Sequence, residues 1–511
     1  MEIYVRTSPV VLTLGAFSML AAGCIAPSEG DDPQGSSKAT QIPAGRPGKD
    51  DRRAIASTTS FLDPKVRVDL VGLNRFGGEH VVVQLRLTNG GSESFTADRA
   101  VQDIAVPRDS PEGRNQASGI GLIDAPARRV LLPYRGGGKC ACTSNLFAGE
   151  SAVLTAGETA TYYAVVPAPS GNARTTTVFT TDTAPMANVP ISDEPPVAPP
   201  GQAIPVPTPD LKAVSHAITS STEALDDTDE THDDGRNLRV NLRSDVLFAL
   251  NKAELTPKAQ SILKATARRI DASPATTVKV EGHADNSGND AINDPLSQRR
   301  ADTVAKALQG MVTRSGVGFQ PKGYGSKRPE YNNESAEGRR RNRRVTVIFA
   351  RPKPPERAPA PAAPAGRSGP VSQNVGGQPF TAQVTGLKPL GNGLGLLTYR
   401  VTNNGTTAAA AGDLKYGEGW LNLVQFFANN AHVIDTTAGR RYQAATYPID
   451  VPGDNSVACL CSPTAGTWAG EDSIQPRASL DYWAVVQLPT GTAPLSVQLG
   501  KFPRIQGVGA G

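Results

Sequence analysis

The sequence predicts a multidomain protein in which a central α/β domain lies between two all-β, immunoglobulin-like sandwich domains. The central segment alternates strand-like and helix-like apolar patterns, whereas the flanking segments show only the period-two alternation of strands. Proline-rich segments separate these parts, and 511 residues are enough for three ordinary domains with linkers. A net charge of +4 gives no sign of a nucleic-acid partner.

The domain boundaries follow changes in composition along the chain. The acidic run over 223–234 lacks the Gly and the final Glu of a calcium-binding loop, so we expect a solvated linker there. The expected parts are a signal peptide over 1–24, a flexible tether over 25–60, a first β-sandwich over 61–182, a Pro-rich and acidic linker over 183–235, the central domain over 236–351, a Pro/Ala-rich linker over 352–375 and a second β-sandwich over 376–506.

The N-terminus predicts export from the cytoplasm. The apolar run over 10–22 is too short to span a bilayer and is typical of a signal peptide. It leads into Gly23-Cys24, which resembles a lipobox; this resemblance implies that Cys24 carries acyl chains such as palmitate and anchors the protein to a membrane. Because Ile25 replaces the Asp of an inner-membrane retention signal, we expect the outer membrane if the cell has one. Ordinary secretion with cleavage near Ala22 is the alternative.

The elements of the central domain alternate between strands and helices. We expect helices to begin behind Thr256-Pro257 and behind Asn293-Asp294-Pro295, because Thr, Asn and Asp cap helices and Pro fits the first turn. A short Arg-rich helix precedes the last strand. These elements predict one sheet with helices on one face. The strands are expected over 240–248, up to His283, over 317–322 and over 345–349.

The two flanking segments resemble each other block by block. Both contain apolar alternation of period two, such as Val81, Val83, Leu85 and Leu87, and lack helical periodicity. We therefore predict a duplicated β-sandwich of immunoglobulin type and of no recognised family. The matching blocks are 71–73 with 385–387, 85–89 with 399–403, 123–129 with 434–441, 140–142 with 459–461, 148–150 with 469–471 and 162–166 with 482–486.

The remaining cysteines form two Cys-x-Cys pairs at matching places in the two copies. Disulfides are expected outside the cytoplasm, and local bonds from Cys140 to Cys142 and from Cys459 to Cys461 would each pin a loop. Bonds between the copies would require the two domains to pack together. A copper or zinc site is the other alternative. No histidine lies nearby in the sequence, so we expect neither a metal nor another cofactor.

Candidate binding residues gather between 281 and 304 in the central domain. The strand that ends near His283 delivers Asp285 to its tip, and the following helix carries Asn293 and Arg300. A carboxylate and a guanidinium so placed suit a zwitterion: Asp285 would take an ammonium group, and Arg300 would take a carboxylate through two parallel hydrogen bonds. Taken alone, such a pair is more often a weak surface salt bridge, and Asn293 a helix cap.

Three blocks of this region resemble the OmpA-like peptidoglycan-binding domain. They are Gly-His-x-Asp over 282–285, Asn-x-x-Leu-Ser-x-x-Arg-Ala-x-x-Val over 293–304 and Gly-Arg-x-x-Asn-Arg-Arg-Val over 338–345. The resemblance implies binding of the diaminopimelate in the peptidoglycan stem peptide by Asp285, Asn293, Arg300 and Arg343. The family usually has Thr where this chain has Ala284, so one hydroxyl donor, worth about 0.5–1.5 kcal/mol, is missing.

Two functions follow from these features. The first is a non-catalytic envelope lipoprotein that binds peptidoglycan and tethers a membrane to the wall. The second is a wall-anchored adhesin or receptor whose β-sandwiches bind a protein or glycan, with Trp420, Trp468 and Trp483 as candidate contacts. An enzyme is not expected, because neither Gly-x-Ser-x-Gly nor His-Glu-x-x-His occurs.

Overall fold

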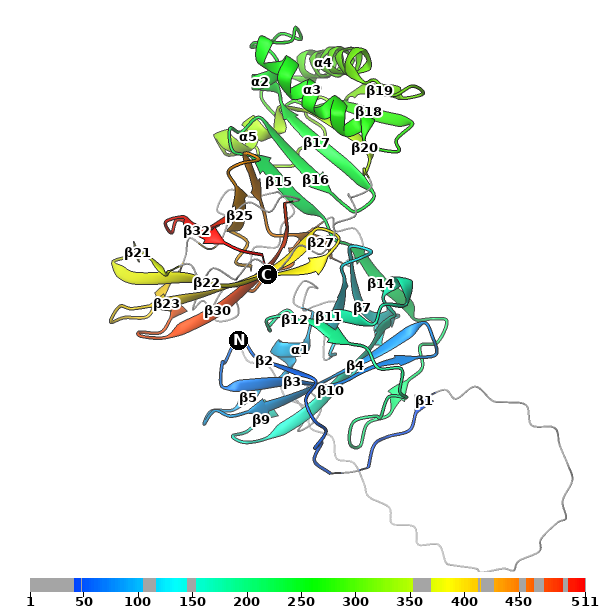
Figure 1. Ribbon diagram of the computed structural model, residues 1–511, viewed down its shortest axis with the longest axis vertical. Helices are drawn as coiled ribbons and strands as arrows, with labels where there is room; N and C mark the ends of the chain where they lie inside the picture. Colours follow the sequence, from blue (N-terminus) through cyan, green and yellow to red (C-terminus); the bar gives the residue numbers. More distant parts are fainter. Residues whose placement is uncertain are drawn as a thin grey trace, which may run out of the picture. The chain divides into compact units, whose positions relative to one another are not determined.

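Two β-rich regions and one α/β region make up the described part of the chain (Figure 1). The computed structural model describes residues 41–46, 48–103, 116–144, 153–352, 369–411, 414, 427–449, 456–463, 473–489 and 495–510. Residues Thr40–Gly511 belong to one unit by their contacts. The predicted signal peptide and Cys24 lie outside the described residues. Among the described helices, none has both the length and the apolar character needed to cross a membrane.

The first β region consists of two sheets with a common core. One sheet has the order β10-β4-β3-β2, and the other has the order β12-β11-β6-β7-β14. Val83 and Leu85 of β4 are fully buried between them, together with Tyr162 and Val178. Two sheets therefore enclose one core, while the immunoglobulin-like topology stays a prediction. The strands are β2 (Ala56–Thr59), β3 (Val66–Phe76), β4 (His80–Asn89), β6 (Gly121–Asp124), β7 (Arg129–Gly136), β10 (Thr159–Pro167), β11 (Thr175–Phe179), β12 (Met186–Pro190) and β14 (Lys212–Ala217), with short elements β5 (Phe95–Thr96), α1 (Asp98–Val101), β8 (Lys139–Cys140) and β9 (Val153–Leu154) beside them.

The second β region repeats the first sheet of the first region. Its sheet β21-β22-β23-β30 corresponds to β2-β3-β4-β10. The long strands β3 and β22 each shift register at the same matched place, between Leu70 and Gly72 and between Val384 and Gly386. The duplication is thus visible in strand order as well as in sequence. The strands are β21 (Val371–Val375), β22 (Gln378–Gly391), β23 (Leu394–Asn403), β24 (Ala409–Ala410), β25 (Ala431–Asp435), β26 (Arg440–Tyr442), β27 (Thr446–Pro448), β28 (Val457–Cys459), β29 (Ser473–Ile474), β30 (Ser479–Gln487), β31 (Leu495–Leu499) and β32 (Ile505–Val508).

The tryptophans do not supply the exposed contacts that the adhesin hypothesis expects. Trp483 of β30 is 2% exposed and packs in the core of the second β region. Trp420 and Trp468 lie outside the described residues. Within the described part of the chain, no tryptophan is therefore available at the surface.

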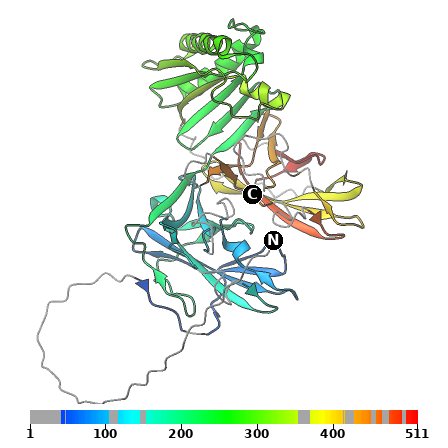
Figure 2. The same cartoon turned by 180° about the vertical axis from the view of Figure 1, so that it is seen from behind.

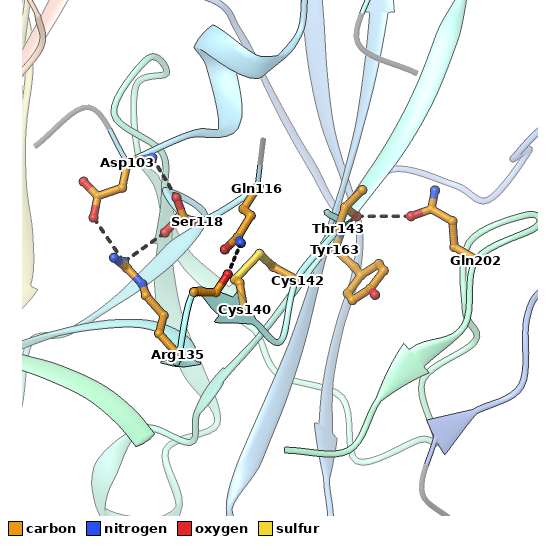
Figure 3. The surroundings of a disulfide bond; sticks show 10 residues. Asp103, Gln116, Ser118, Arg135, Cys140, Cys142, Thr143, Tyr163 and Gln202 are labelled. Atoms are coloured by element: carbon orange, nitrogen blue, oxygen red, sulfur yellow. Dashed lines mark hydrogen bonds and ion pairs between the residues drawn. A yellow bond between two sulfur atoms is a disulfide. The ribbon is translucent and has the colours of Figure 1, made fainter. Parts of the chain in front are cut away.

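In the first copy, the Cys-x-Cys segment joins the two sheets. The backbone N–H of Ala141 donates to the carbonyl of Tyr134 on β7 (2.9 Å), and the carbonyl of Ala141 accepts from Val165 on β10 (2.7 Å). A disulfide links Cys140 to Cys142 on either side of this residue (Figure 3). The bond therefore closes a small ring around a residue that connects the two sheets.

The second copy has the same connection. The N–H of Leu460 donates to the carbonyl of Ala445, and its carbonyl accepts from Val485 on β30, each at 2.8 Å. A disulfide links Cys459 to Cys461. Both disulfides are therefore local, and neither joins one copy to the other.

The central domain has a mixed sheet in the order β19-β18-β20-β17. The helices α3 and α4 lie on one face of this sheet, as the front and back views show (Figures 1 and 2). Leu263 of α3 and Val304 of α4 are fully buried with Val278 and Val347 of the sheet. The predicted α/β arrangement is confirmed. The elements are β17 (Asn237–Arg243), α2 (Ser244–Leu247), α3 (Pro257–Asp271), β18 (Thr277–Gly282), α4 (Asp290–Met311), β19 (Gly318–Gly323), α5 (Ala336–Asn342) and β20 (Arg344–Ala350).

Two boundaries in the central domain differ from the sequence expectation. The helix expected to begin at Pro295 is α4, which begins at Asp290, and Asn289 caps it by accepting from the N–H of Ile292 (3.1 Å). Asn289 provides the cap four residues before Asn293, so Asn293 and Pro295 both lie inside the helix. The strand expected over 240–248 ends at Arg243, where α2 begins.

The segment 183–235, expected to be a linker, contains several strands. Besides β12, β13 (Ile204–Pro205) and β14, this segment contains the hairpin β15 (Ser220–Ala224) and β16 (Asp229–Asp233). β16 pairs with β17 and β15 pairs with β26, so a ten-stranded sheet runs from the central domain into the second β region. Strands β1 (Gln41–Ile42), β2 and β21 likewise begin inside the expected tether and the second linker.

Part of the acidic run in this segment is buried, although Asp226 and Asp227 at the hairpin turn are exposed. Glu223 and Glu230 are 2% and 4% exposed. The cations that neutralise them come from distant parts of the chain: Arg341 binds Glu223 from 118 positions away, and Arg441 lies 3.5 Å from the same carboxylate. Sequence composition cannot reveal partners so far apart, and without them an acidic run is expected to stay in water.

Candidate ligand-binding site

The end of β18 is held very close to α4, which places the candidate site. A Cβ atom on Gly282 would lie 2.0 Å from the carbonyl oxygen of Ser297, so only glycine permits this approach. Asp285 follows three residues later, and its Oδ1 accepts from the backbone N–H of Ser287 (2.9 Å). The carboxylate is thereby fixed at the strand end, beside the first turns of α4.

Asp285 forms an ion pair with Arg343, the residue that follows α5. Nη1 of Arg343 donates to Oδ2 of Asp285. The side chain of Asp285 is 6% exposed, whereas that of Arg343 is 38% exposed. The carboxylate of the pair is therefore buried in the protein, whereas the guanidinium remains accessible to solvent.

Arg300 of α4 is oriented by an aromatic ring and a backbone carbonyl. Its guanidinium lies over the ring of Phe248, 5.1 Å from the centroid, and its Nε donates to the carbonyl of Lys252 (3.0 Å). Among the described residues, its two Nη groups have no protein acceptor. Burial lowers the pKa of Arg300, and the neighbouring cation Arg343 lowers it further. Arginine still carries its charge at neutral pH, so two cations with open donors lie together near one carboxylate.

Asn293 shapes the loop between the strand and the helix. Its Nδ2 donates to the carbonyl of Ser287 (2.9 Å), and the residue is 8% exposed. Asn293 does not cap the helix, since Asn289 does. It therefore supports the loop that holds Asp285, and this structure assigns it no contact with Arg300.

The structure brings the predicted residues to one place but pairs them differently. The sequence predicted that Asp285 and Arg300 form the two ends of the site. In the structure, Asp285 forms its ion pair with Arg343, and the guanidinium of Arg300 lies over the ring of Phe248. Phe248 and the Lys252 carbonyl were missed; an aromatic residue at the end of the first predicted strand was the only available signal. Ala284, in the place of the family's Thr, uses its N–H to bond the carbonyl of Gly325 (2.8 Å).

A second charged cluster surrounds Arg341 on α5. Arg341 donates to Glu223 of β15 (2.6 Å) and to Glu337 (2.8 Å) and lies 3.8 Å from Glu230 of β16. The hydroxyl of Tyr331 donates to Glu230. Burial raises the pKa of Glu230 to about 7, and the adjacent Glu223 adds to the shift. This cluster joins the central domain to the β15–β16 hairpin, and its donors are occupied by protein acceptors.

Glu330 anchors the neighbouring part of the same junction. Its carboxylate pairs with Arg344 (3.0 Å) and Arg239, and it accepts from Nδ2 of Asn241 (2.9 Å). Burial opposes the ionised form of Glu330, but Arg344 and Arg239 outweigh it and lower its pKa to about 2. Sequence reasoning did not identify Glu330, although its partner Arg344 lies in the 338–345 block.

The described residues contain no group of three or more His, Cys, Asp or Glu side chains that could hold a metal ion. The four Cys-x-Cys sulfurs are joined in disulfides, so they offer no thiolate ligands in this state. The candidate site is thus made of a carboxylate, two guanidinium groups and an aromatic ring.

A family model and several known proteins match the central segment. The OmpA family model matches residues 247–343, so both flanking β regions lie outside it. The putative lipoprotein YfiB of Escherichia coli (strain K12) is 36% identical over 115 residues, which are 22% of this chain and 71% of that protein. The peptidoglycan-binding protein ArfA of Mycobacterium tuberculosis is 31% identical over 153 residues, which are 30% of this chain and 39% of that protein.

Solved structures match over a similar share of the chain. The cell wall anchor of the T6SS from Pseudomonas aeruginosa has 32% sequence identity and a TM-score of 0.23, and the match covers 24% of this chain and 88% of that one. The peptidoglycan-associated lipoprotein from Burkholderia pseudomallei has 21% identity and a TM-score of 0.18, and the match covers 20% of this chain and 87% of that one.

Proposed function

Because the chain belongs to the OmpA family, we propose that it is a non-catalytic cell-envelope protein that binds peptidoglycan through its central domain. The names of its relatives, which include a peptidoglycan-binding protein and lipoproteins, support this function. The proposed ligand is the diaminopimelate of the stem peptide, which carries an ammonium and a carboxylate on one carbon.

The observation that carries the proposal is the unused hydrogen-bonding capacity of Arg300. Its Nε and its ring contact fix the guanidinium, while its Nη groups find no acceptor among the described residues. A fixed guanidinium binds a carboxylate through two parallel hydrogen bonds and loses little entropy in doing so. Arg343, which is 38% exposed, can donate to the same ligand carboxylate.

Asp285 would receive the ammonium group of the ligand. Each of its oxygens accepts one hydrogen bond in the structure, from Ser287 and from Arg343, and a carboxylate has about four acceptor positions in all. Asp285 can therefore keep both partners and accept an ammonium as well. We expect single-site affinity on the order of micromolar to millimolar, with many stem peptides giving avidity.

The same proposal includes a tether between membrane and wall. Cys24 would carry the lipid anchor in the outer membrane of a cell that has one, and the central domain would hold the wall. An oxidising envelope is consistent with the disulfides in both β regions.

The test measures sedimentation of the full chain with purified peptidoglycan. Asp285→Ala and Arg300→Ala should each reduce the bound fraction strongly, whereas Arg299→Ala, one residue away and exposed, should not. If both site variants sediment like the parent, the site is wrong. The full chain is required, because a fragment over 236–351 would lose Glu223 and Glu230 and leave Arg341 with Glu337 as its remaining described carboxylate partner.

A further inference from the structure

The two β regions carry an arginine at the same position of the duplicated sheet. In the first copy Arg86 of β4 faces Thr161 of β10, and in the second copy Arg400 of β23 faces Asp481 of β30. Leu85 precedes Arg86 and points into the core, so the arginines lie on the outer face of their sheets. The two copies can therefore be compared residue by residue at this face.

In the first copy, the chain's own N-terminal segment covers this arginine. Nη1 of Arg86 donates to the backbone carbonyls of Asp50 (3.0 Å) and Arg52 (2.8 Å), while its Nη2 binds the carboxylate of Asp69 (2.8 Å). Thr161 donates to the carboxylate of Asp50 (2.8 Å). Arg86 is left 14% exposed. One arginine thus holds a peptide segment by its backbone while a carboxylate fixes the guanidinium.

In the second copy, the matching arginine is fixed by a carboxylate from the strand on its other side, Asp481 of β30 instead of a residue of β22, and no described segment covers it. Nε and Nη2 of Arg400 donate to the two oxygens of Asp481 (2.6 and 2.7 Å), and the side chains are 52% and 57% exposed. Among the described residues, Nη1 has no protein acceptor. Thr402 and Ser479 share a hydrogen bond beside it (2.7 Å) and are also exposed to solvent in part.

We propose that the sheet face around Arg400 binds an extended peptide segment of a partner protein. The backbone carbonyls of that segment accept from Nη1 of Arg400, as those of Asp50 and Arg52 accept from Arg86. An exposed ion pair such as Arg400–Asp481 adds little to stability, but it orients the guanidinium before binding.

The negative charge of Asp481 restricts which side chain the bound segment can place beside it. Thr161, which receives the acidic side chain of Asp50 in the first copy, is replaced by Asp481 in the second. A carboxylate at this place repels another acidic side chain. The partner segment therefore has a neutral residue, such as Asn, at the position equivalent to Asp50.

The probe is a synthetic, fluorescently labelled peptide with the sequence of residues 45–57 and the substitution Asp50→Asn. Anisotropy with the full chain should show saturable binding, and Arg400→Ala should weaken it at least about tenfold, since charge-assisted hydrogen bonds are lost. Arg504→Ala, an exposed arginine of the same β region, should leave it unchanged. The peptide that keeps Asp50 should bind less tightly.

Three results would overturn the proposal. One is the absence of binding to the parent chain. Another is equal binding to the parent and to Arg400→Ala, which would indicate displacement of the segment in the first copy. The third is binding that appears only after residues 353–368 are deleted, which would assign the face to the chain's own segment. Asp285→Ala should not alter peptide binding, so failure here is distinguishable from failure of the wall-binding function.

Discussion

The cluster around Arg341 and the candidate site around Arg343 use the same kinds of residue at the end of one short helix. Arg341 is 7% exposed and is surrounded by Glu223, Glu337 and Glu230, so its donors are occupied within the protein. Arg343, two positions later, has one carboxylate partner and keeps over a third of its side chain in water. The sequence 339–344 is rich in arginine throughout, so the density of charge does not distinguish a structural cluster from a binding site. What distinguishes them is whether the N–H groups of the arginine already have acceptors within the protein.

The largest expected effect is on the structural cluster. Arg341→Met removes the cation between the buried carboxylates of Glu223 and Glu230 and leaves Glu223 with the more distant cation Arg441 (3.5 Å), so we expect a loss of about 3–5 kcal/mol in the free energy of unfolding. Denaturation with urea measures it. Arg340→Met is the matched control, because its 30% exposed ion pair with Glu337 should contribute less than about 1 kcal/mol. Similar losses in both variants would show that the cluster is not specially dependent on Arg341.

The next effect is a dependence of stability on pH at Glu330. Its pKa in the folded protein is about 2, below the ordinary value of 4.5, so its stabilisation is complete above the ordinary value and is lost as the pH falls toward 2. We expect a loss of about 2–3 kcal/mol over that range. Glu330→Gln should flatten this part of the profile, whereas the exposed Glu334→Gln should not. An unchanged profile in Glu330→Gln would contradict the assignment.

A smaller effect is expected from a substitution at the candidate site, and it should reduce ligand binding more than it reduces stability. Arg300→Lys keeps the charge but loses the planar fork, so peptidoglycan binding should weaken about tenfold. The free energy of unfolding should change by no more than about 1 kcal/mol. Arg299→Lys is the control in the same sedimentation assay. A lysine that binds as well as the parent arginine would show that no bidentate contact forms.

The smallest expected effect is a gain at Ala284. Ala284→Thr restores the hydroxyl that related domains usually have and should raise affinity by about two- to tenfold, the equivalent of one hydrogen bond. Ala284→Val has nearly the same shape without the hydroxyl and should give no gain. Equal affinities for the Thr and Val variants would mean that the ligand does not reach this position.

Local patterns were enough to predict most elements of the central domain, since the Thr256 cap and the apolar faces of α3 and α4 are encoded by neighbouring residues. The sequence also located Asp285, Arg300 and Arg343, whose role as ligand contacts stays a prediction. The hairpin β15–β16 was missed because its acidic residues look solvated until Arg341 and Arg441 are brought to them by the fold. The pairing of Asp285 with Arg343 was missed for the same reason, because 58 positions separate the two residues.

The β15–β26 junction would carry part of any mechanical load between the central domain and the second β region. Its residues pair from Thr222 with Tyr442 to Ala224 with Arg440, so the strands form a short clamp between the central domain and the second β region. A pull between the central domain and the second β region would be shared between this clamp and the covalent chain that leaves β20. When the clamp separates, the strand edges of β15 and β26 are exposed together, and re-pairing can restore the connection once the tension falls.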